Sequence, residues 1–297
     1  MNKKPRLSKS GIEYLDYVWN FCSGCENAER GICPLGKDCW ATKIAERFTV
    51  HYPNGFKPTI YPEAFLSPLH LKKPSIIGCA FMGDLFGDWV DPDKKIHSVM
   101  PSGKVSISMS LKGWIFTTIN QCPQHTFLFL TKCPWNLPKW SPFPDNCWVG
   151  VTATTTDMAV AGLTALSDIE AKVKYISFEP LLSHIPINAN ALSGIGLVII
   201  GAMTGTKYDL MLYVDNHFGD GECLYTLMPY GNKWSLQPPI EWIEEIVRAA
   251  DKAGIPVFLK ENLRPLLREN VTPKRNAWAL SKVNLYKGEL WRQEVPK

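Results

Sequence analysis

Four cysteines lie within eighteen residues near the N-terminus, at Cys22, Cys25, Cys33 and Cys39. The same stretch holds three glycines and a proline, a composition typical of a loop that bends sharply. Thiolates are ligands for zinc and for iron–sulfur clusters. We therefore interpret this stretch as a loop that gathers thiolates around a metal centre.

Two metal chemistries compete for this loop. A structural zinc ion uses four thiolates in a closed tetrahedron, whereas a 4Fe–4S cluster with one open iron uses three. Two residues separate Cys22 from Cys25, which is typical of zinc, but five residues separate Cys33 from Cys39, so the second short pair is missing. The spacing alone leaves both chemistries open.

The composition limits where the protein works. The N-terminus has no signal peptide pattern, and no apolar run approaches the roughly 20 residues that span a bilayer. We expect a cytoplasmic protein with no membrane partner, in which nine cysteines do not form a disulfide framework. A net charge of +4 is too small to indicate nucleic-acid binding by itself.

Short apolar runs predict the elements that position the cysteines. Six of them read as buried parallel strands, at 75–80, 126–130, 147–151, 174–178, 197–200 and 256–259, and a further strand at 17–20 precedes the cysteines. The segment 240–253 reads as an amphipathic helix that ends at Gly254. Cys79 and Cys147 lie within apolar strands and are expected in the core.

This alternation predicts an α/β fold of about seven βα units, namely a complete or partial (β/α) barrel of the TIM-barrel type. We expect one domain over residues 1–297, with a cysteine-rich loop at 20–41 and a lid insertion at 205–236. Aromatic residues in the part of the insertion at 218–234 are candidates for stacking a base.

Polar residues or glycines follow each predicted strand. They include Asp84, Thr131, Lys132, Thr152, Glu179 and Gly201. In a barrel, the carboxyl ends of the strands meet at one mouth, so these residues are expected to share a pocket. The cysteine loop follows the first strand and belongs at the same mouth. This location favours an iron–sulfur cluster, because a purely structural zinc ion has no reason to lie there.

A series of short motifs adds a resemblance to a known family. They lie at Ser10–Tyr14, Trp19–Asn20, Gly24–Cys25, Cys39–Ala41, Met82–Phe86, Phe129–Pro134, Trp148–Thr152, Ser177–Leu182, Ile199–Gly201 and Ala253–Lys260. In this order they resemble a widespread, phage-associated family of radical S-adenosylmethionine (SAM)-like proteins of unassigned function, related to spore photoproduct lyase. The resemblance covers roughly residues 10–260.

The resemblance implies a radical SAM barrel in which three cysteines bind a 4Fe–4S cluster. The amino and carboxylate groups of SAM would chelate the cluster's open iron, and an electron would then cleave a C–S bond to release a 5′-deoxyadenosyl radical. Carried over by position, the ligands are Cys25, Cys33 and Cys39. Their spacing is wider than is usual in the family, which leaves Cys22 as an alternative ligand.

The strand-end residues then acquire expected roles in binding SAM. Asp84 would accept hydrogen bonds from the methionine ammonium and Lys132 would pair with its carboxylate. Thr131, Thr152 or Glu179 would meet the ribose hydroxyls, and Gly201 is a further candidate for binding the cofactor. For Glu179 the alternative is an ion pair with Lys132 or Lys260.

The substrate class follows from the same relation. Kinship with a DNA-lesion repair enzyme favours a nucleobase or nucleic acid as substrate, with an external electron donor such as flavodoxin or ferredoxin. Cys133 and Cys223 are candidate hydrogen-atom donors. One rival is a zinc-stabilised nucleic-acid-binding protein without catalysis, and another is a barrel hydrolase that uses Asp84 and Glu179 as acid and base.

Overall fold

The computed structural model describes residues 6–33, 39–99, 106–218, 224–267, 286–287 and 290–296. The chain divides into two compact units, one of Met1–Val151 with Thr164–Lys172, the other of Thr152–Leu163 with Val173–Lys297. The expected single domain stays a prediction. Among the described residues, no helix is both long and apolar enough to cross a bilayer.

The first unit is built on a mostly parallel sheet. Its strands, in spatial order, are β1 (Leu7–Lys9), β2 (Tyr17–Trp19), β5 (Ile76–Cys79), β8 (Thr126–Thr131) and β9 (Cys147–Thr152). β2, β5, β8 and β9 pair in parallel, and only β1 pairs antiparallel, with β2. The predicted strands at 17–20, 75–80, 126–130 and 147–151 are therefore confirmed.

Aromatic side chains fill the core of this unit. Trp19, on β2, is fully buried, and its ring packs edge-on against Phe127 with 5.9 Å between centroids. The Trp19 indole N–H donates to the Ala64 carbonyl at 2.7 Å, so burial leaves no unpaired donor there. Phe86 packs in the same manner against Trp140. The loop that contains Phe86 is thus anchored in the core.

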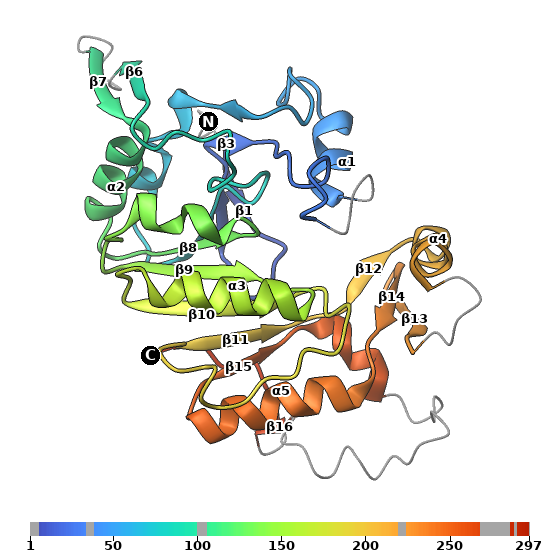
Figure 1. The fold of residues 1–297 in the computed structure, drawn as a ribbon. Coiled ribbons are helices and arrows are strands. Elements are labelled where there is room, and N and C mark those ends of the chain that lie inside the picture. The colour runs from blue at the N-terminus through green and yellow to red at the C-terminus, as the bar shows by residue number, and fades with distance from the viewer. Residues whose placement is uncertain are drawn as a thin grey trace. The chain divides into compact units, whose positions relative to one another are not determined.

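Shorter elements surround this sheet. They are β3 (Cys22–Ser23), α1 (Trp40–Arg47), β4 (Thr59–Ile60), η2 (Pro62–Ala64), η3 (Ser67–His70), β6 (Lys95–Val99), β7 (Ser106–Ser110), α2 (Leu111–Asn120) and η4 (Pro134–Trp140). β3 pairs with β4, and β6 pairs with β7, both antiparallel. Figure 1 shows the β6–β7 pair next to α2, whose first turn is capped by Ser110. Neither antiparallel pair was predicted from the sequence.

The second unit contains three parallel strands, β10 (Val173–Phe178), β11 (Leu197–Ile200) and β15 (Val257–Leu259). Helix α3 (Thr156–Ser167) begins in this unit, and the division between the units falls within it. Helix α5 (Ile240–Ala253) has the predicted bounds, and Gly254 ends it at φ +71°. Figure 1 shows α5 running alongside β11 and β15. The short helix η5 (Glu261–Leu267) follows β15 in the chain.

The predicted insertion at 205–236 has secondary structure of its own. It contains helix α4 (Lys207–Phe218) and most of an antiparallel sheet of β12 (Met203–Gly205), β14 (Lys233–Gln237) and β13 (Thr226–Tyr230). A further short pair joins β16 (Tyr286–Lys287) to β17 (Leu290–Trp291). Residues 179–196, after β10, contain no helix. The predicted α/β class with parallel strands is confirmed, whereas a closed barrel stays a prediction.

Candidate functional site

Two glycines hold the cysteine loop against the loop that follows β5. Gly24 and Gly83 form an isolated parallel bridge between the two loops. Gly24 has φ +82°, and a Cβ atom there would lie 2.4 Å from the Phe56 carbonyl oxygen. A Cβ atom on Gly83 would lie 2.5 Å from the Gly24 oxygen. Because only glycine allows this approach, the following residues, Cys25 and Asp84, are brought close together.

The buried Asp84 carboxylate joins three segments of the first unit. Its Oδ2 accepts hydrogen bonds from Asn27 Nδ2 at 2.8 Å and the Lys132 amide at 3.0 Å. Its Oδ1 accepts from Thr131 Oγ1 at 2.7 Å and the Phe86 amide at 3.0 Å. Each oxygen thus already accepts two bonds, which is its usual capacity. Binding of the methionine ammonium by Asp84 would displace one of these donors, and it stays a prediction.

Asn27 organises the cysteine loop through both its backbone and its side chain. Its carbonyl accepts hydrogen bonds from the amides of Ile32 and Cys33, at 2.8 and 3.0 Å. Its backbone N–H donates to the Cys25 sulfur, and its side-chain oxygen accepts from Cys133 Sγ at 3.1 Å. The side chain is buried. Asn27 therefore sets the positions of Cys25 and Cys33 relative to the end of β8.

The candidate ligands differ in burial. Cys25, Cys33 and Cys39 are half-buried, whereas Cys22 lies fully buried in β3. Burial is the largest cause that raises the pKa of the Cys25 thiol to about 11, and negative charge on Asp84, Cys39 or Cys33 adds to it. Burial also raises the pKa of Cys22. The three half-buried thiols are therefore more accessible to a metal than the thiol of Cys22.

These thiols do not form a preformed metal cage. Within the described parts of the chain, no three His, Cys, Asp or Glu side chains are grouped tightly enough to hold a metal ion. Residues 34–38, between Cys33 and Cys39, lie outside the described residues. Cys39 itself packs against Ala41, Ala45 and Met82 at the start of α1. The ligand set therefore stays a prediction.

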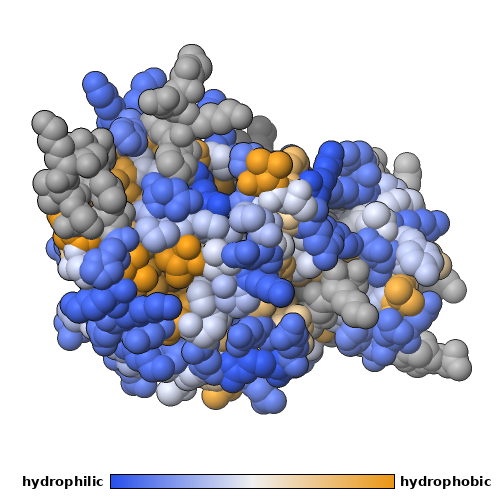
Figure 2. All heavy atoms as spheres, turned by 90° about the horizontal axis from the view of Figure 1, so that it is seen from above, coloured by the Kyte–Doolittle hydropathy of each residue, from blue (hydrophilic) through white to orange (hydrophobic). Residues whose placement is uncertain are grey.

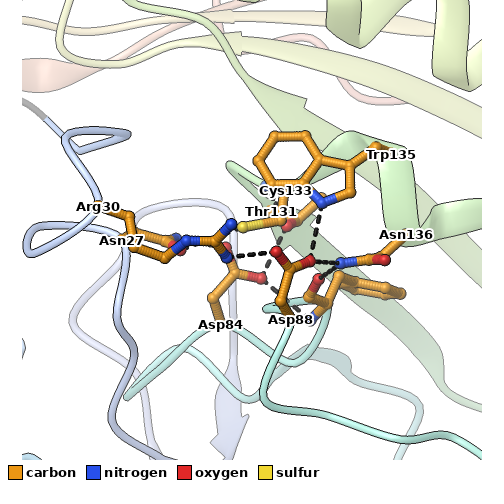
Figure 3. A network of polar contacts seen from close by, with 9 residues as sticks. Asn27, Arg30, Asp84, Asp88, Thr131, Cys133, Trp135 and Asn136 are labelled. Atoms are coloured by element: carbon orange, nitrogen blue, oxygen red, sulfur yellow. Dashed lines mark hydrogen bonds and ion pairs between the residues drawn. The ribbon is translucent and has the colours of Figure 1, made fainter.

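A second carboxylate, Asp88, ties the cysteine loop to η4 (Figure 3). Its Oδ1 accepts hydrogen bonds from Trp135 Nε1 at 2.8 Å and Asn136 Nδ2 at 2.6 Å, and its Oδ2 forms an ion pair with Arg30. The bonds from Trp135, Asn136 and Arg30, in that order, lower the pKa of Asp88 to about 2. Asp88 is thus ionised at neutral pH and fixes Arg30, which lies in sequence between Cys25 and Cys33.

Only one of the two candidate hydrogen-atom donors lies among the described residues. Cys133 is fully buried, and its Sγ donates to Asn27 in the bond already described. Burial is the main cause of its raised pKa, so the thiol stays protonated at neutral pH. A substrate would need to displace covering atoms to reach this sulfur, and the donor role stays a prediction. Cys223 lies outside the described residues.

In the second unit, Glu179 forms an ion pair with Lys260, which is the alternative expected for this residue. The pair lies over Gly201, where a Cβ atom would come within 3.0 Å of Lys260 Cδ and 3.1 Å of Glu179 Cγ. A glycine at this strand end therefore makes room for the pair. Thr152, at the end of β9, is buried. The structure thus brings Glu179 and Gly201 together, and their contacts with SAM stay predictions.

Comparison with known proteins assigns the chain to a family. Residues 9–213 match the family described as Protein of unknown function (DUF5131). The chain belongs to this family. No curated protein matches the sequence. The matched region contains all of the candidate ligands and the network around Asp84 and Asp88, whereas Lys260 lies beyond it. The phage association that the resemblance carried stays a prediction.

The fold of this DUF5131 protein is similar to that of solved structures of spore photoproduct lyase. A cysteine-to-alanine variant of spore photoproduct lyase, solved with dinucleoside spore photoproduct, is similar with a TM-score of 0.53 and 10% identity, over 88% of this chain and 81% of that one. A tyrosine-to-phenylalanine variant of the same lyase gives 0.52 and 9%, over 87% and 80%. At such low identity the likeness shows the fold alone.

Several residues of the candidate site were not predicted from the sequence. They are Asn27, Arg30, Asp88, Trp135 and Asn136. Asn and Asp within loops usually indicate turns, so nothing separated these residues from ordinary turn formers. The one available signal was position, because Asp88 and Trp135 each follow closely after a motif at a strand end.

The aromatic segment at 218–234, expected as a base-stacking surface, is partly packed away. Tyr225 is 8% exposed, and its hydroxyl donates to the Leu182 carbonyl. Trp234 is half-buried, with the Lys207 ammonium 4.9 Å from its ring centroid. Both rings therefore already have partners within the second unit.

Proposed function

We propose that this protein is a radical SAM enzyme in which Cys25, Cys33 and Cys39 hold a 4Fe–4S cluster and SAM binds its open iron. The observation that carries the proposal is that the loop bearing these half-buried thiols is fixed to the loops that follow β5 and β8. The likeness of the fold to spore photoproduct lyase supports it.

The donor set fits such a cluster in kind. Clusters of this type are bound by cysteine thiolates, and Cys25, Cys33 and Cys39 are half-buried and lie outside the strands. Cys22 lies in β3 and is fully buried there, so we rank it as the alternative ligand. Because binding requires deprotonated thiols, the raised pKa of Cys25 implies that the cluster displaces a proton there.

The surrounding residues would orient SAM and keep water away. When bound, the cluster would supply the electron that cleaves SAM to the 5′-deoxyadenosyl radical. Lys132, whose backbone amide is held by Asp84, would pair with the methionine carboxylate. Thr131 and Asp84 are buried and fix the loop from which Lys132 projects. An external donor such as flavodoxin or ferredoxin would deliver the electron, in a reducing compartment such as the cytoplasm.

For the substrate we propose a nucleobase, free or within a nucleic acid. The support is that a lyase of similar fold was solved with dinucleoside spore photoproduct. The exposed Trp135 beside the cysteine loop is consistent with a planar substrate. This substrate class is separable from the cluster chemistry, and each has its own test.

Anaerobic reconstitution with iron and sulfide tests the cluster. We expect the wild-type chain to turn brown and retain iron and sulfide. The Cys25→Ala/Cys33→Ala/Cys39→Ala variant should retain neither, and Cys22→Ala should behave as the wild type. Cys122→Ala is the matched control, because Cys122 is a buried cysteine of the same unit outside the loop. Stoichiometric zinc and no iron would favour the rival zinc-stabilised nucleic-acid-binding protein and overturn the proposal.

A further inference from the structure

Trp135 is a large aromatic residue that the fold leaves exposed. Among the described residues, exposed hydrophobic side chains are scattered over several elements, and Figure 2 shows them on one face as small groups among hydrophilic ones. Trp135 is 48% exposed although it follows directly after the buried Cys133 and Pro134. Because Trp combines a large apolar ring with a polar N–H, it is enriched at interfaces, so an exposed indole at the edge of a candidate site is a candidate binding surface.

The indole is held in one orientation. Its Nε1 donates to Asp88 Oδ1 at 2.8 Å, and the same oxygen accepts from Asn136 Nδ2 at 2.6 Å. The buried Asn136 also donates to the Phe86 carbonyl at 2.7 Å. Figure 3 shows the indole nitrogen turned toward Asp88 and the six-membered ring pointing away from it. A ring fixed in advance loses little conformational entropy when a ligand binds to it.

A guanidinium lies on the other side of the same carboxylate. Arg30 pairs with Asp88 through Oδ2, and its side chain is 40% exposed. Arg30 lies within the loop that carries Cys25 and Cys33, and Asp88 thus links the indole to that loop. Aromatic and guanidinium planes are the two side-chain surfaces on which bases stack.

We propose that the exposed face of Trp135, with Arg30 beside it, stacks a nucleobase of a single-stranded nucleic acid. This inference rests on the proposed function for its link to a reaction, but binding itself does not require the cluster. The contact is with the ring of the base rather than with phosphate, because Asp88 already balances the charge of Arg30. A protein partner that covers Trp135 is the competing interpretation.

Fluorescence anisotropy with a labelled oligothymidylate at low salt tests this proposal on the full chain. Trp135→Phe keeps an aromatic face but loses the bond to Asp88, so it should bind more weakly than the wild type and more tightly than Trp135→Leu and Trp135→Ala, which should bind about tenfold more weakly than the wild type or worse. Phe48→Leu is the control, because Phe48 is similarly exposed at the end of α1 in the same unit. Equal unfolding midpoints for the Phe and Leu variants keep the comparison independent of folding.

An abasic strand of equal length separates base stacking from phosphate contacts. We expect it to bind the wild type as weakly as oligothymidylate binds Trp135→Leu. The proposal is overturned if the abasic strand binds as tightly as oligothymidylate, if Trp135→Leu binds like the wild type, or if the wild type does not bind. Because the assay uses protein without iron, a failure to assemble the cluster would overturn the proposed function and leave this inference standing.

Discussion

At the scale of single residues, the first unit depends on buried polar side chains that each bind more than one loop. Asp84 accepts four hydrogen bonds, from Asn27, Thr131, Lys132 and Phe86. The Asn27 backbone carbonyl binds within the cysteine loop, and the Asn27 side-chain amide connects that loop to Asp84 and Cys133. A buried polar group left without its partner loses far more than the net value of one hydrogen bond.

Replacing Asn27 tests this connection. We expect Asn27→Ala to lower the free energy of unfolding by about 1–3 kcal/mol, because Asp84 and Cys133 both lose a buried partner. Iron retained after reconstitution should fall as well. The measurement is urea unfolding followed by tryptophan fluorescence.

Asn54→Ala is the matched control, because the Asn54 amide makes an exposed bond to Thr59 at 3.3 Å. It should change the unfolding free energy by less than about 0.5 kcal/mol. Equal unfolding curves for Asn27→Ala and Asn54→Ala would contradict the role assigned to Asn27.

At the scale of elements, the parallel strands and α5 were predictable and the network between loops was not. In the run 126–130 the consecutive residues Phe127, Leu128 and Phe129 are all apolar, because the strand is buried on both faces, and α5 shows a clear helical period. The short antiparallel pairs β3–β4 and β12–β14 leave no such pattern. The contacts of Asp88 and Trp135 join residues far apart in sequence, so local spacing did not indicate them.

Gly83→Ala tests the contact between the two loops. The added Cβ atom would lie 2.5 Å from the Gly24 oxygen, a backbone atom that cannot rotate away. We expect a loss of about 1–3 kcal/mol in unfolding free energy, as is usual for overpacking, together with poorer iron retention.

Gly11→Ala is the comparison, because a Cβ atom on Gly11 would meet no heavy atom within 4 Å. That variant should unfold like the wild type. Iron retention and stability unchanged in Gly83→Ala would show that the loops do not lie as closely as described.

At the scale of the whole molecule, buried thiols make stability depend on alkaline pH. Burial raises the pKa of Cys79, Cys122 and Cys147 above the ordinary value of 9.0. A thiol whose pKa is higher in the folded state than in the unfolded state stabilises the fold fully below about pH 9. This contribution is lost as pH rises, because only the unfolded chain then ionises.

Cys147→Ala tests this dependence away from the candidate ligands. At about pH 10, one unit above the ordinary pKa, the Cys147 thiol should cost about 1.4 kcal/mol of stability. Urea unfolding at about pH 7 and about pH 10 should show a decrease for the wild type, and a decrease smaller by about 1 kcal/mol for the variant. An identical decrease in both proteins would contradict the expectation.

The central claim is that the cysteine loop assembles a cluster that reacts with SAM. Its most direct test is the formation of 5′-deoxyadenosine by the reconstituted protein, reduced with dithionite under anaerobic conditions in the presence of SAM. We predict this product from the wild type and from Cys122→Ala, and none from the Cys25→Ala/Cys33→Ala/Cys39→Ala variant. A wild-type protein with a complete cluster that yields no 5′-deoxyadenosine would contradict the account.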